Sequence, residues 1–194
     1  MGMAMEPFVS PDERIRLVHD LIAAWAARDL ERFLDCLTDD VEWDDPAMSA
    51  PARGKEAVRT FAQAVLVAFP DFALTLRGPV CVAPDGGSCA VPWRITGTHL
   101  HPLAPGYAPT RRTATFDGID HMEFRGDRIA RIGTFFDLRV AASQLLGVSL
   151  RPRPGGWGER TLVVCQRLVA ALVRSAGRHA APAPEDGTDH HPAA

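Results

Sequence analysis

The chain has 194 residues, of which 46% are hydrophobic and 23% charged, and its formal net charge is −3. This length and composition are ordinary for one soluble globular domain with a real core, and two domains would not fit comfortably. No basic stripe supports nucleic-acid binding, no apolar run approaches the ~20 residues that cross a bilayer, and residues 1–10 do not form a secretory signal. We therefore expect a cytoplasmic protein that does not insert into membranes.

Four cysteines, Cys36, Cys81, Cys89 and Cys165, show no C-x-x-C spacing. This spacing argues against a disulfide framework or a zinc site and predicts reduced, mostly buried thiols. The seven histidines form no H-E-x-x-H pattern, so we expect no metal ligand set among them.

Helical signals dominate the first 70 residues. Ser10 is followed by a proline at the first helical position and by Glu13, which completes a capping box, and apolar residues then recur at helical spacing as far as Trp25. A second, short helix is predicted to follow Asp29. A third is predicted over residues 54–69, where an apolar stripe ends at a Pro-Asp pair.

The segment between the second and third helices is predicted to hold one short strand. Residues 38–40, Thr-Asp-Asp, favour a turn, and residues 41–43, Val-Glu-Trp, favour a strand that ends at Asp44-Asp45-Pro46. Residues 48–53 are small and are predicted to form a loop.

The hydrophobic period changes to two after residue 71, which indicates strands. Four antiparallel strands are predicted, over residues 72–82 with a break at Gly78-Pro79, 88–98, 111–124 and 128–137. A short helix over residues 138–146 should follow, with Asp137 as its cap. The predicted fold class is α+β, a curved antiparallel sheet that forms a cone-shaped half-barrel covered by the N-terminal helices.

The composition shifts after Gly147. We expect residues 1–10 to be flexible, 11–148 to form the α+β domain, 149–178 to form a linker and a C-terminal helix, and 179–194 to be a disordered tail. The apolar stripe of that helix, which includes Leu162, Leu168 and Leu172, favours packing on the domain or on a sister subunit. Because arginines flank the stripe, a helix lying on a membrane surface is the alternative.

The order of elements, with Val41-Glu42-Trp43-Asp44-Asp45-Pro46 and Asp117-Gly118-Ile119-Asp120-His121-Met122-Glu123-Phe124, resembles the nuclear transport factor two superfamily. Within it the chain is similar to the SnoaL-like polyketide cyclases and the ketosteroid isomerases over roughly residues 11–148. The punctuating segments Gly54-Lys55-Glu56, Gly78-Pro79-Val80 and Asp127-Arg128-Ile129 recur in the same order. The resemblance implies a cystatin-like cone-shaped fold and a homodimer.

The resemblance also implies roles for individual residues. Ketosteroid isomerases place a general-base aspartate before a proline at the end of the first strand, the position of Asp45, and a protonated aspartate that hydrogen-bonds the oxyanion, the position of Asp120. Leu21 stands where those enzymes carry a tyrosine. In the cyclases an acid aspartate lies on the last strand, where this chain has Thr134.

The residues themselves favour the same pair. Asp120 shares its strand parity with Gly118, Met122 and Phe124, so its carboxylate should lie among apolar side chains with a raised pKa. The alternative is a structural aspartate bonded to the backbone or to Arg94. Asp45 should be wetter and stay ionised, and the alternative for it is a simple turn former. Asp44 should point outward.

We predict that Asp45 and Asp120 are catalytic and that their carboxylates open into one apolar cavity. The predicted substrate-binding residues are Trp43, Phe61, Phe69, Trp93, Ile95, Met122, Ile132, Thr134 and Phe136. The partner should be a small hydrophobic organic substrate, with no metal or organic cofactor. The chemistry favoured is isomerisation or cyclisation of a polyketide- or terpenoid-like carbonyl compound in secondary metabolism. The alternatives are a hydrolase or dehydratase, and a non-catalytic ligand-binding domain.

Overall fold

The computed structural model describes residues 9–103, 108–147 and 154–179. The chain divides into two compact units, residues 1–148 and 149–194. The predicted flexible start, apart from its last two residues, and the predicted disordered tail, apart from its first residue, lie outside the described residues.

Local signals account for the helices of the first unit. They are α1 (Pro11–Ala26), α2 (Leu30–Asp35), α3 (Lys55–Ala68) and α4 (Leu138–Leu146). The capping box at the start of α1 is confirmed, because Ser10 accepts from the backbone of Glu13 and the Glu13 carboxylate accepts from the backbone of Ser10. Asp137 caps α4 as predicted, and Asp29 caps α2.

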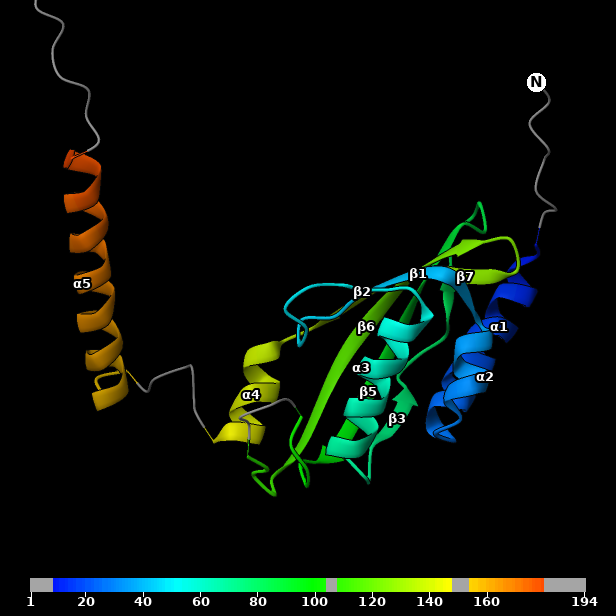
Figure 1. The fold of residues 1–194 in the computed structure, drawn as a ribbon, viewed down its shortest axis with the longest axis horizontal. Helices are drawn as coiled ribbons and strands as arrows, with labels where there is room; N and C mark the ends of the chain where they lie inside the picture. The colour runs from blue at the N-terminus through cyan, green and yellow to red at the C-terminus, as the bar shows by residue number, and fades with distance from the viewer. Residues whose placement is uncertain (1–8, 104–107, 148–153, 180–194) are drawn as a thin grey trace, which may run out of the picture. The chain divides into compact units, whose positions relative to one another are not determined.

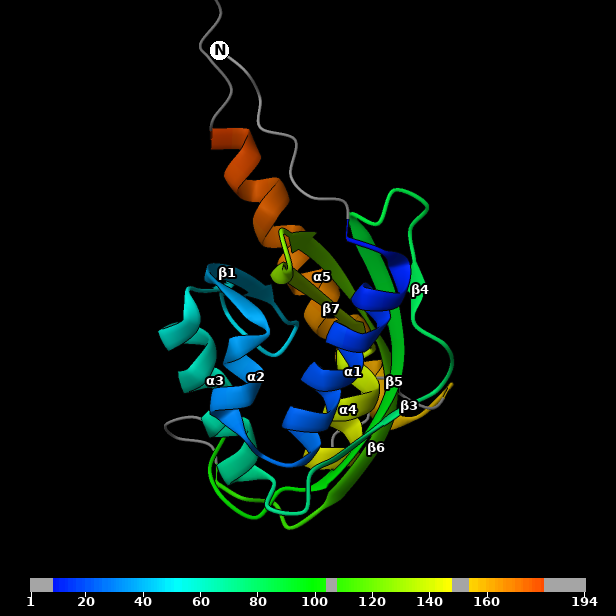
Figure 2. The same ribbon diagram turned by 90° about the vertical axis from the view of Figure 1, so that its right-hand side faces the viewer.

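An open, curved sheet is the other layer of this unit (Figure 1). Its strands are β1 (Leu37–Asp44), β2 (Ala52–Arg53), β3 (Ala73–Leu76), β4 (Cys81–Val82), β5 (Ser88–Thr98), β6 (Thr113–Arg125) and β7 (Arg128–Phe136). The spatial order is β2-β1-β7-β6-β5-β3, and β4 also pairs with β5. In Figure 2 the long strands β5 and β6 curve around the helices α1, α2 and α3, so the helices cover one face of the sheet.

Two parts of the sheet differ from the predicted pattern. The residues predicted as a turn, 38–40, belong to β1, which pairs in parallel with β7 rather than antiparallel. The predicted loop contains β2, which pairs with the end of β1. Both differences arise because the pairing partner supplies backbone hydrogen bonds that no local signal reports.

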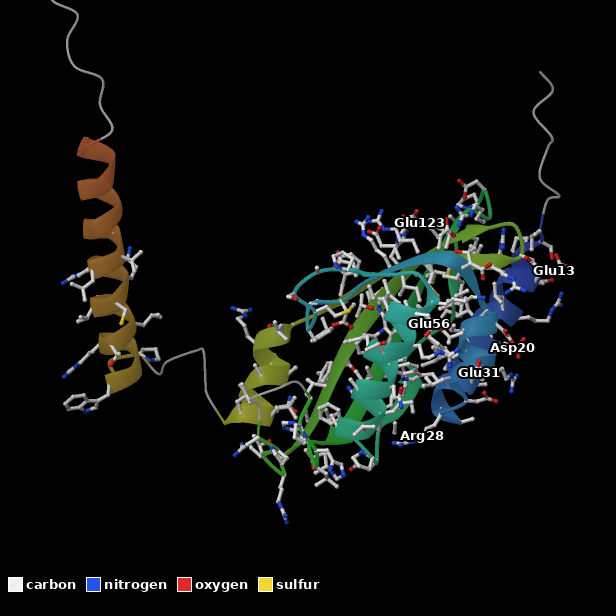
Figure 3. All side chains as sticks on the ribbon, in the orientation of Figure 1. Glu13, Asp20, Arg28, Glu31, Glu56 and Glu123 are labelled. Atoms are coloured by element: carbon white, nitrogen blue, oxygen red, sulfur yellow. The ribbon has the colours of Figure 1, made fainter. Side chains whose placement is uncertain are left out.

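The alternation along β6 separates two chemically different faces. Asp120 and Met122 are buried on the inner face, whereas Asp117, Ile119 and His121 are exposed on the outer one. The predicted parity of this strand is therefore confirmed. Charged side chains also lie at the outside of the helical layer, among them Glu31 and Glu56, labelled in Figure 3.

The four cysteines are free, as predicted, but only Cys36 and Cys89 are buried, whereas Cys81 and Cys165 are exposed. Two of the four cysteines are thus buried, fewer than predicted.

The second unit contains α5 (Trp157–His179), a helix in the segment predicted to hold one, residues 149–178, that extends one residue beyond it. On this helix taken by itself, Leu162 and Leu168 of the predicted stripe are exposed. Their covering by the domain or by a partner subunit stays a prediction, and the side chain of Leu172 lies outside the description. None of the described helices is both long and apolar enough to span a bilayer.

Candidate active site

A cavity of about 720 Å³ lies between the helices and the inner face of the sheet. Its wall is mostly aromatic and aliphatic, and its size falls in the range of small-molecule binding sites. One aromatic group in this wall joins the helices to β1, with Trp43 packed edge-on against Phe61 at 5.2 Å between ring centroids. A second group lies on the sheet, where Phe116 packs against Phe136 at 5.0 Å and near Trp93.

Asp120 reaches this cavity from the middle of β6. It pairs with Thr134 of β7 and with Val91 of β5, so it has strands on both sides, and it is 8% exposed. The Thr134 hydroxyl donates a hydrogen bond of 2.9 Å to Oδ1 of Asp120. Arg94, the alternative partner considered from the sequence, lies on the outer face and binds Asp117 instead.

Thr134 links Asp120 to the first strand. The indole N–H of Trp43 donates to the Thr134 hydroxyl oxygen at 2.9 Å. Because Trp43 can only donate, this contact leaves the Thr134 proton available to the carboxylate. The chain Trp43–Thr134–Asp120 thus runs across β1, β7 and β6 and fixes the orientation of the carboxyl group.

Trp93 lies next to this carboxylate and is 1% exposed. Its indole N–H is close enough to lower the pKa of Asp120, although it falls short of a well-formed hydrogen bond and Nε1 has no other partner. Gly118 makes room for the ring, because a Cβ there would overlap Trp93 and lie 2.8 Å from the carbonyl oxygen of Phe135. A glycine is therefore needed at this point of β6 for steric reasons.

Asp45 follows the end of β1 and is 8% exposed. The backbone N–H of Ala47 donates to its Oδ1 at 2.7 Å, and Met48 donates to its backbone carbonyl. Asp45 is therefore a turn former, as its alternative interpretation held, and also a carboxylate in the cavity wall. The loop of residues 46–50 lines the cavity beside it.

Burial dominates the electrostatics of both carboxylates. It raises the pKa of Asp120 to about 6, against the lowering effects of the nearby Trp93 N–H and of the hydrogen bond from Thr134, and the charge of Asp45 adds to the rise. It also raises the pKa of Asp45 to about 6, against the hydrogen bond from Ala47. Asp45 is less solvated than expected, because it is 8% exposed, like Asp120, and its pKa is raised rather than ordinary.

Eight of the nine predicted substrate-binding residues line the cavity together with Asp45 and Asp120. Met122 is the exception: it has the right strand parity but lies fully buried in the core beyond the cavity. Asp44 and His121 point outward as expected.

Other wall residues were missed from the sequence. They come from α1 (Leu21, Ile22, Trp25), from α4 (Leu138, Ala141, Ala142, Leu145, Leu146) and from the segment after β5 (His99, Leu103). The apolar stripe of α1 is visible in the sequence, but nothing local tells which part of a buried stripe meets a cavity rather than the core. His99 gives no local signal either, because it lies in a Pro/Gly-rich segment.

Comparisons with known proteins agree with this architecture. The family model described as "SnoaL-like domain" matches residues 18–132. TsrD from Streptomyces laurentii is 21% identical with a TM-score of 0.62, over 72% of this chain and 99% of that one. A candidate SnoaL-like polyketide cyclase from Jannaschia sp. CCS1 is 18% identical with a TM-score of 0.62, over 78% and 100%.

A third structure, TerC co-crystallised with polyporic acid, is 22% identical with a TM-score of 0.58, over 70% of this chain and 99% of that one. At these identities the likeness shows a shared fold. No curated protein matches the chain.

Proposed function

The chain belongs to the SnoaL-like domain family, in the nuclear transport factor two superfamily, and we propose from this premise that it is a cofactor-independent acid–base enzyme. It isomerises or cyclises a lipophilic polyketide- or terpenoid-like carbonyl compound, as part of secondary metabolism in the cytoplasm, and it works as a homodimer. Asp45 is the base and Asp120 is the acid.

The observation that carries the proposal is the pair of buried carboxylates in one apolar cavity. Among the ion pairs of the described residues, none includes Asp45 or Asp120. A buried carboxylate without a cation costs folding free energy, which a mere binding cavity for an apolar ligand has no need to bear. Raised pKa values in a cavity are instead typical of acid–base sites.

The reaction begins at a C–H bond of the carbon next to the substrate carbonyl. Asp45 takes this proton, the C–H electron pair moves into the new C=C bond, and the carbonyl oxygen becomes an enolate oxygen. Asp120 in its protonated form donates a hydrogen bond to that oxygen. In an isomerisation the proton held by Asp45 then returns to a different carbon, and the carbonyl group re-forms. In a cyclisation the enolate carbon instead attacks a second carbonyl carbon, the first carbonyl group re-forms, and the oxygen of the second group takes the proton from Asp45 and becomes a hydroxyl.

The hydrogen bonds of the pair support this division of labour. The Ala47 N–H occupies Oδ1 of Asp45 and leaves Oδ2 to accept a proton. Thr134 occupies Oδ1 of Asp120, which leaves the second oxygen to hold a proton toward the ligand. Two interacting carboxyl groups with pKa values of about 6 share one proton near that pH. The rate should therefore peak around pH 6 and fall on both sides.

Deuterium exchange tests the proposal without knowledge of the natural substrate. The probe is 2-tetralone, an aromatic ketone with acidic α-protons, followed by NMR in D₂O. The protein should accelerate the exchange, and Asp45→Asn should slow it by roughly 10²-fold or more, because the proton acceptor is lost. The control is Asp44→Asn, which removes an exposed neighbouring carboxylate and should leave the rate unchanged.

Three results would decide against the proposed chemistry. Equal exchange rates for the wild type and Asp45→Asn would mean that Asp45 is no base. Exchange that depends on Asp44 as much as on Asp45 would assign the effect to surface charge. A ketone that binds without any enzymatic exchange would favour the non-catalytic binding domain.

A further inference from the structure

The cavity extends far along β5 from the carboxylate pair. Trp93, Ile95 and Gly97 occupy successive inner positions of this strand, and all three line the cavity. His99 continues the same alternation just after the strand, where its backbone still pairs with Arg111 and Arg112. From Trp93 to His99 the wall spans six residues, or about 20 Å at the rise of a β-strand.

His99 is a buried polar group in this otherwise apolar end of the cavity. It is 4% exposed. The backbone N–H of Thr110 donates to its Nδ1 at 3.3 Å. Because a backbone N–H can only donate, Nδ1 is the acceptor nitrogen and the proton of the neutral ring is on Nε2. Among the described residues, none forms a hydrogen bond with that Nε2.

The surroundings of His99 hold its ring in place. The imidazole stacks on Phe69, with 5.5 Å between ring centroids and an angle of 30°. Phe69 can lie this close to the sheet because position 97 is a glycine, whose Cβ would be 3.3 Å from the Phe69 ring. The orientation of the histidine is thus fixed from two sides, by Thr110 at Nδ1 and by Phe69 at its face.

We propose that His99 is a second polar anchor of the cavity and that its Nε2–H donates a hydrogen bond to the bound ligand. The ligand is then an elongated, mainly apolar compound with a hydrogen-bond acceptor, a carbonyl, hydroxyl or ether oxygen, at the end remote from its reacting carbonyl. The assignment of the reacting end rests on the proposed function, whereas the anchor itself rests on His99.

A buried donor without a partner lowers the stability of the free protein, and a ligand acceptor recovers this loss. Between His99 and the carboxylates, the wall of β5 is otherwise formed by apolar side chains and a glycine. Such a wall makes no directional contact with the middle of a ligand. The polar groups at the two ends of the cavity therefore fix the orientation of the ligand. His99 therefore sets which end of a long substrate faces Asp45 and Asp120.

Two ketones that differ at one end test the anchor. The probes are 4-acetyl-p-terphenyl and 4,4″-diacetyl-p-terphenyl, which share three rings and differ by a second carbonyl group at the opposite end. The diketone should bind the wild type about tenfold more tightly in a fluorescence titration, as expected for one additional hydrogen bond. His99→Phe, which keeps the stacked ring but no donor, should remove this advantage and leave the affinity for the monoketone unchanged.

His101→Phe is the matched control, because His101 is exposed and two positions further along the chain; it should keep the tenfold advantage. His99→Gln retains an N–H donor and should keep part of it. An advantage that persists in His99→Phe, or that is absent from the wild type, would overturn the anchor.

Histidine NMR of the wild type gives a second readout that does not depend on how the variant folds. The Nε2–H signal of His99 should shift with the diketone and not with the monoketone, and equal spectra for the two probes would overturn the proposal. The experiments can reject the anchor and the proposed reaction independently of each other. A His99-dependent advantage without Asp45-dependent exchange of 2-tetralone keeps the anchor and rejects the proposed reaction.

Discussion

Asp117 and Asp120 lie on the same strand, β6, and have opposite environments. Asp117 is exposed on the outer face, where two nitrogens of Arg94 donate to its carboxylate at 2.7 and 2.8 Å and hold its pKa below the ordinary range. Asp120 is buried on the inner face without a cation, and its pKa is raised to about 6. An odd spacing along a strand places two residues on opposite faces, and that alone separates the two carboxylates.

The comparison shows how one residue type serves two purposes. A carboxylate with a guanidinium partner stays charged at every pH near neutrality and so cannot exchange a proton there. A carboxylate deprived of cations changes its protonation near the pH at which the protein works, at a cost in stability. Substitutions at and around these two residues test the contrast.

The largest effect should come from Asp120→Leu, which removes the hydrogen-bond donor to the enolate. We expect the exchange rate of 2-tetralone to fall roughly 10²- to 10³-fold, as when an oxyanion donor is lost. Asp120→Asn keeps a donor and should be slowed less than Asp120→Leu. If Asp120→Asn is as inactive as Asp45→Asn, then Asp120 transfers a proton rather than donating a hydrogen bond.

Gly118→Ala should be the most destabilising of the small changes. The added methyl group overlaps Trp93 beside Asp120, and overpacking of this kind costs about 1–3 kcal/mol of unfolding free energy. Gly133→Ala is the control, because its Cβ would meet no atom closer than the ring of Phe135, at 3.4 Å. Denaturant unfolding of both variants compares them, and equal losses would contradict the close approach of Trp93 to β6.

Asp120→Asn should stabilise the protein at pH 7. The folded pKa of about 6 lies above the ordinary 3.8, so the folded state binds more protons between these values. The stability of the wild type relative to Asp120→Asn therefore falls as the pH rises from about 4 to 6. Taken in full, this difference in pKa corresponds to a gain in unfolding free energy of at most about 3 kcal/mol for the variant above pH 6. Urea midpoints at pH 3.5 and pH 7 measure this gain, which should vanish at the lower pH.

Thr134→Val should raise the pKa of Asp120 further, because the hydrogen bond from the hydroxyl lowers it. The basic limb of the rate profile should move to higher pH by less than about one unit. The variant should also lose about 1–3 kcal/mol of unfolding free energy, because Trp43 loses its acceptor. Thr134→Ser keeps the hydroxyl and should behave like the wild type in both assays. A pH profile unchanged in Thr134→Val would mean that Thr134 only packs.

The smallest effect is expected for Asp117→Asn. Exposed ion pairs contribute little to stability, and the outer face takes no part in the proposed chemistry. The exchange rate should stay within about twofold of the wild type, with a slight loss of thermal stability that disappears at high salt. A slowing comparable to that of Asp120→Asn would end the distinction between the two faces.

Local patterns in the sequence are enough to predict the parts of this protein that depend on neighbouring residues. The capping box at Ser10 and Glu13, the Asp137 cap, and the parity that turns Asp120 inward and Asp117 outward are all set within a few positions along the chain. Such features follow from helix capping and from the two-residue period of a strand, and both are local.

The side chains that Asp120 meets depend on the tertiary structure. Thr134 is opposite Asp120 because β6 and β7 pair in one register, and Trp43 reaches Thr134 because β1 pairs in parallel with β7. Register between distant strands depends on the whole sheet and on the loops that join them, so a sequence pattern gives the face of a residue without giving its partner.

Tertiary structure also decided the burial of Asp45 and of His99. In the sequence Asp45 is a turn residue before a proline and His99 lies in a Pro/Gly-rich segment, and both patterns are typical of exposed positions. The loop of residues 46–50 lines the cavity beside Asp45, and the ring of Phe69 stacks on His99. Burial is a sum over contacts from distant segments, and the raised pKa of Asp45 and the unpartnered donor of His99 arise only once those contacts form.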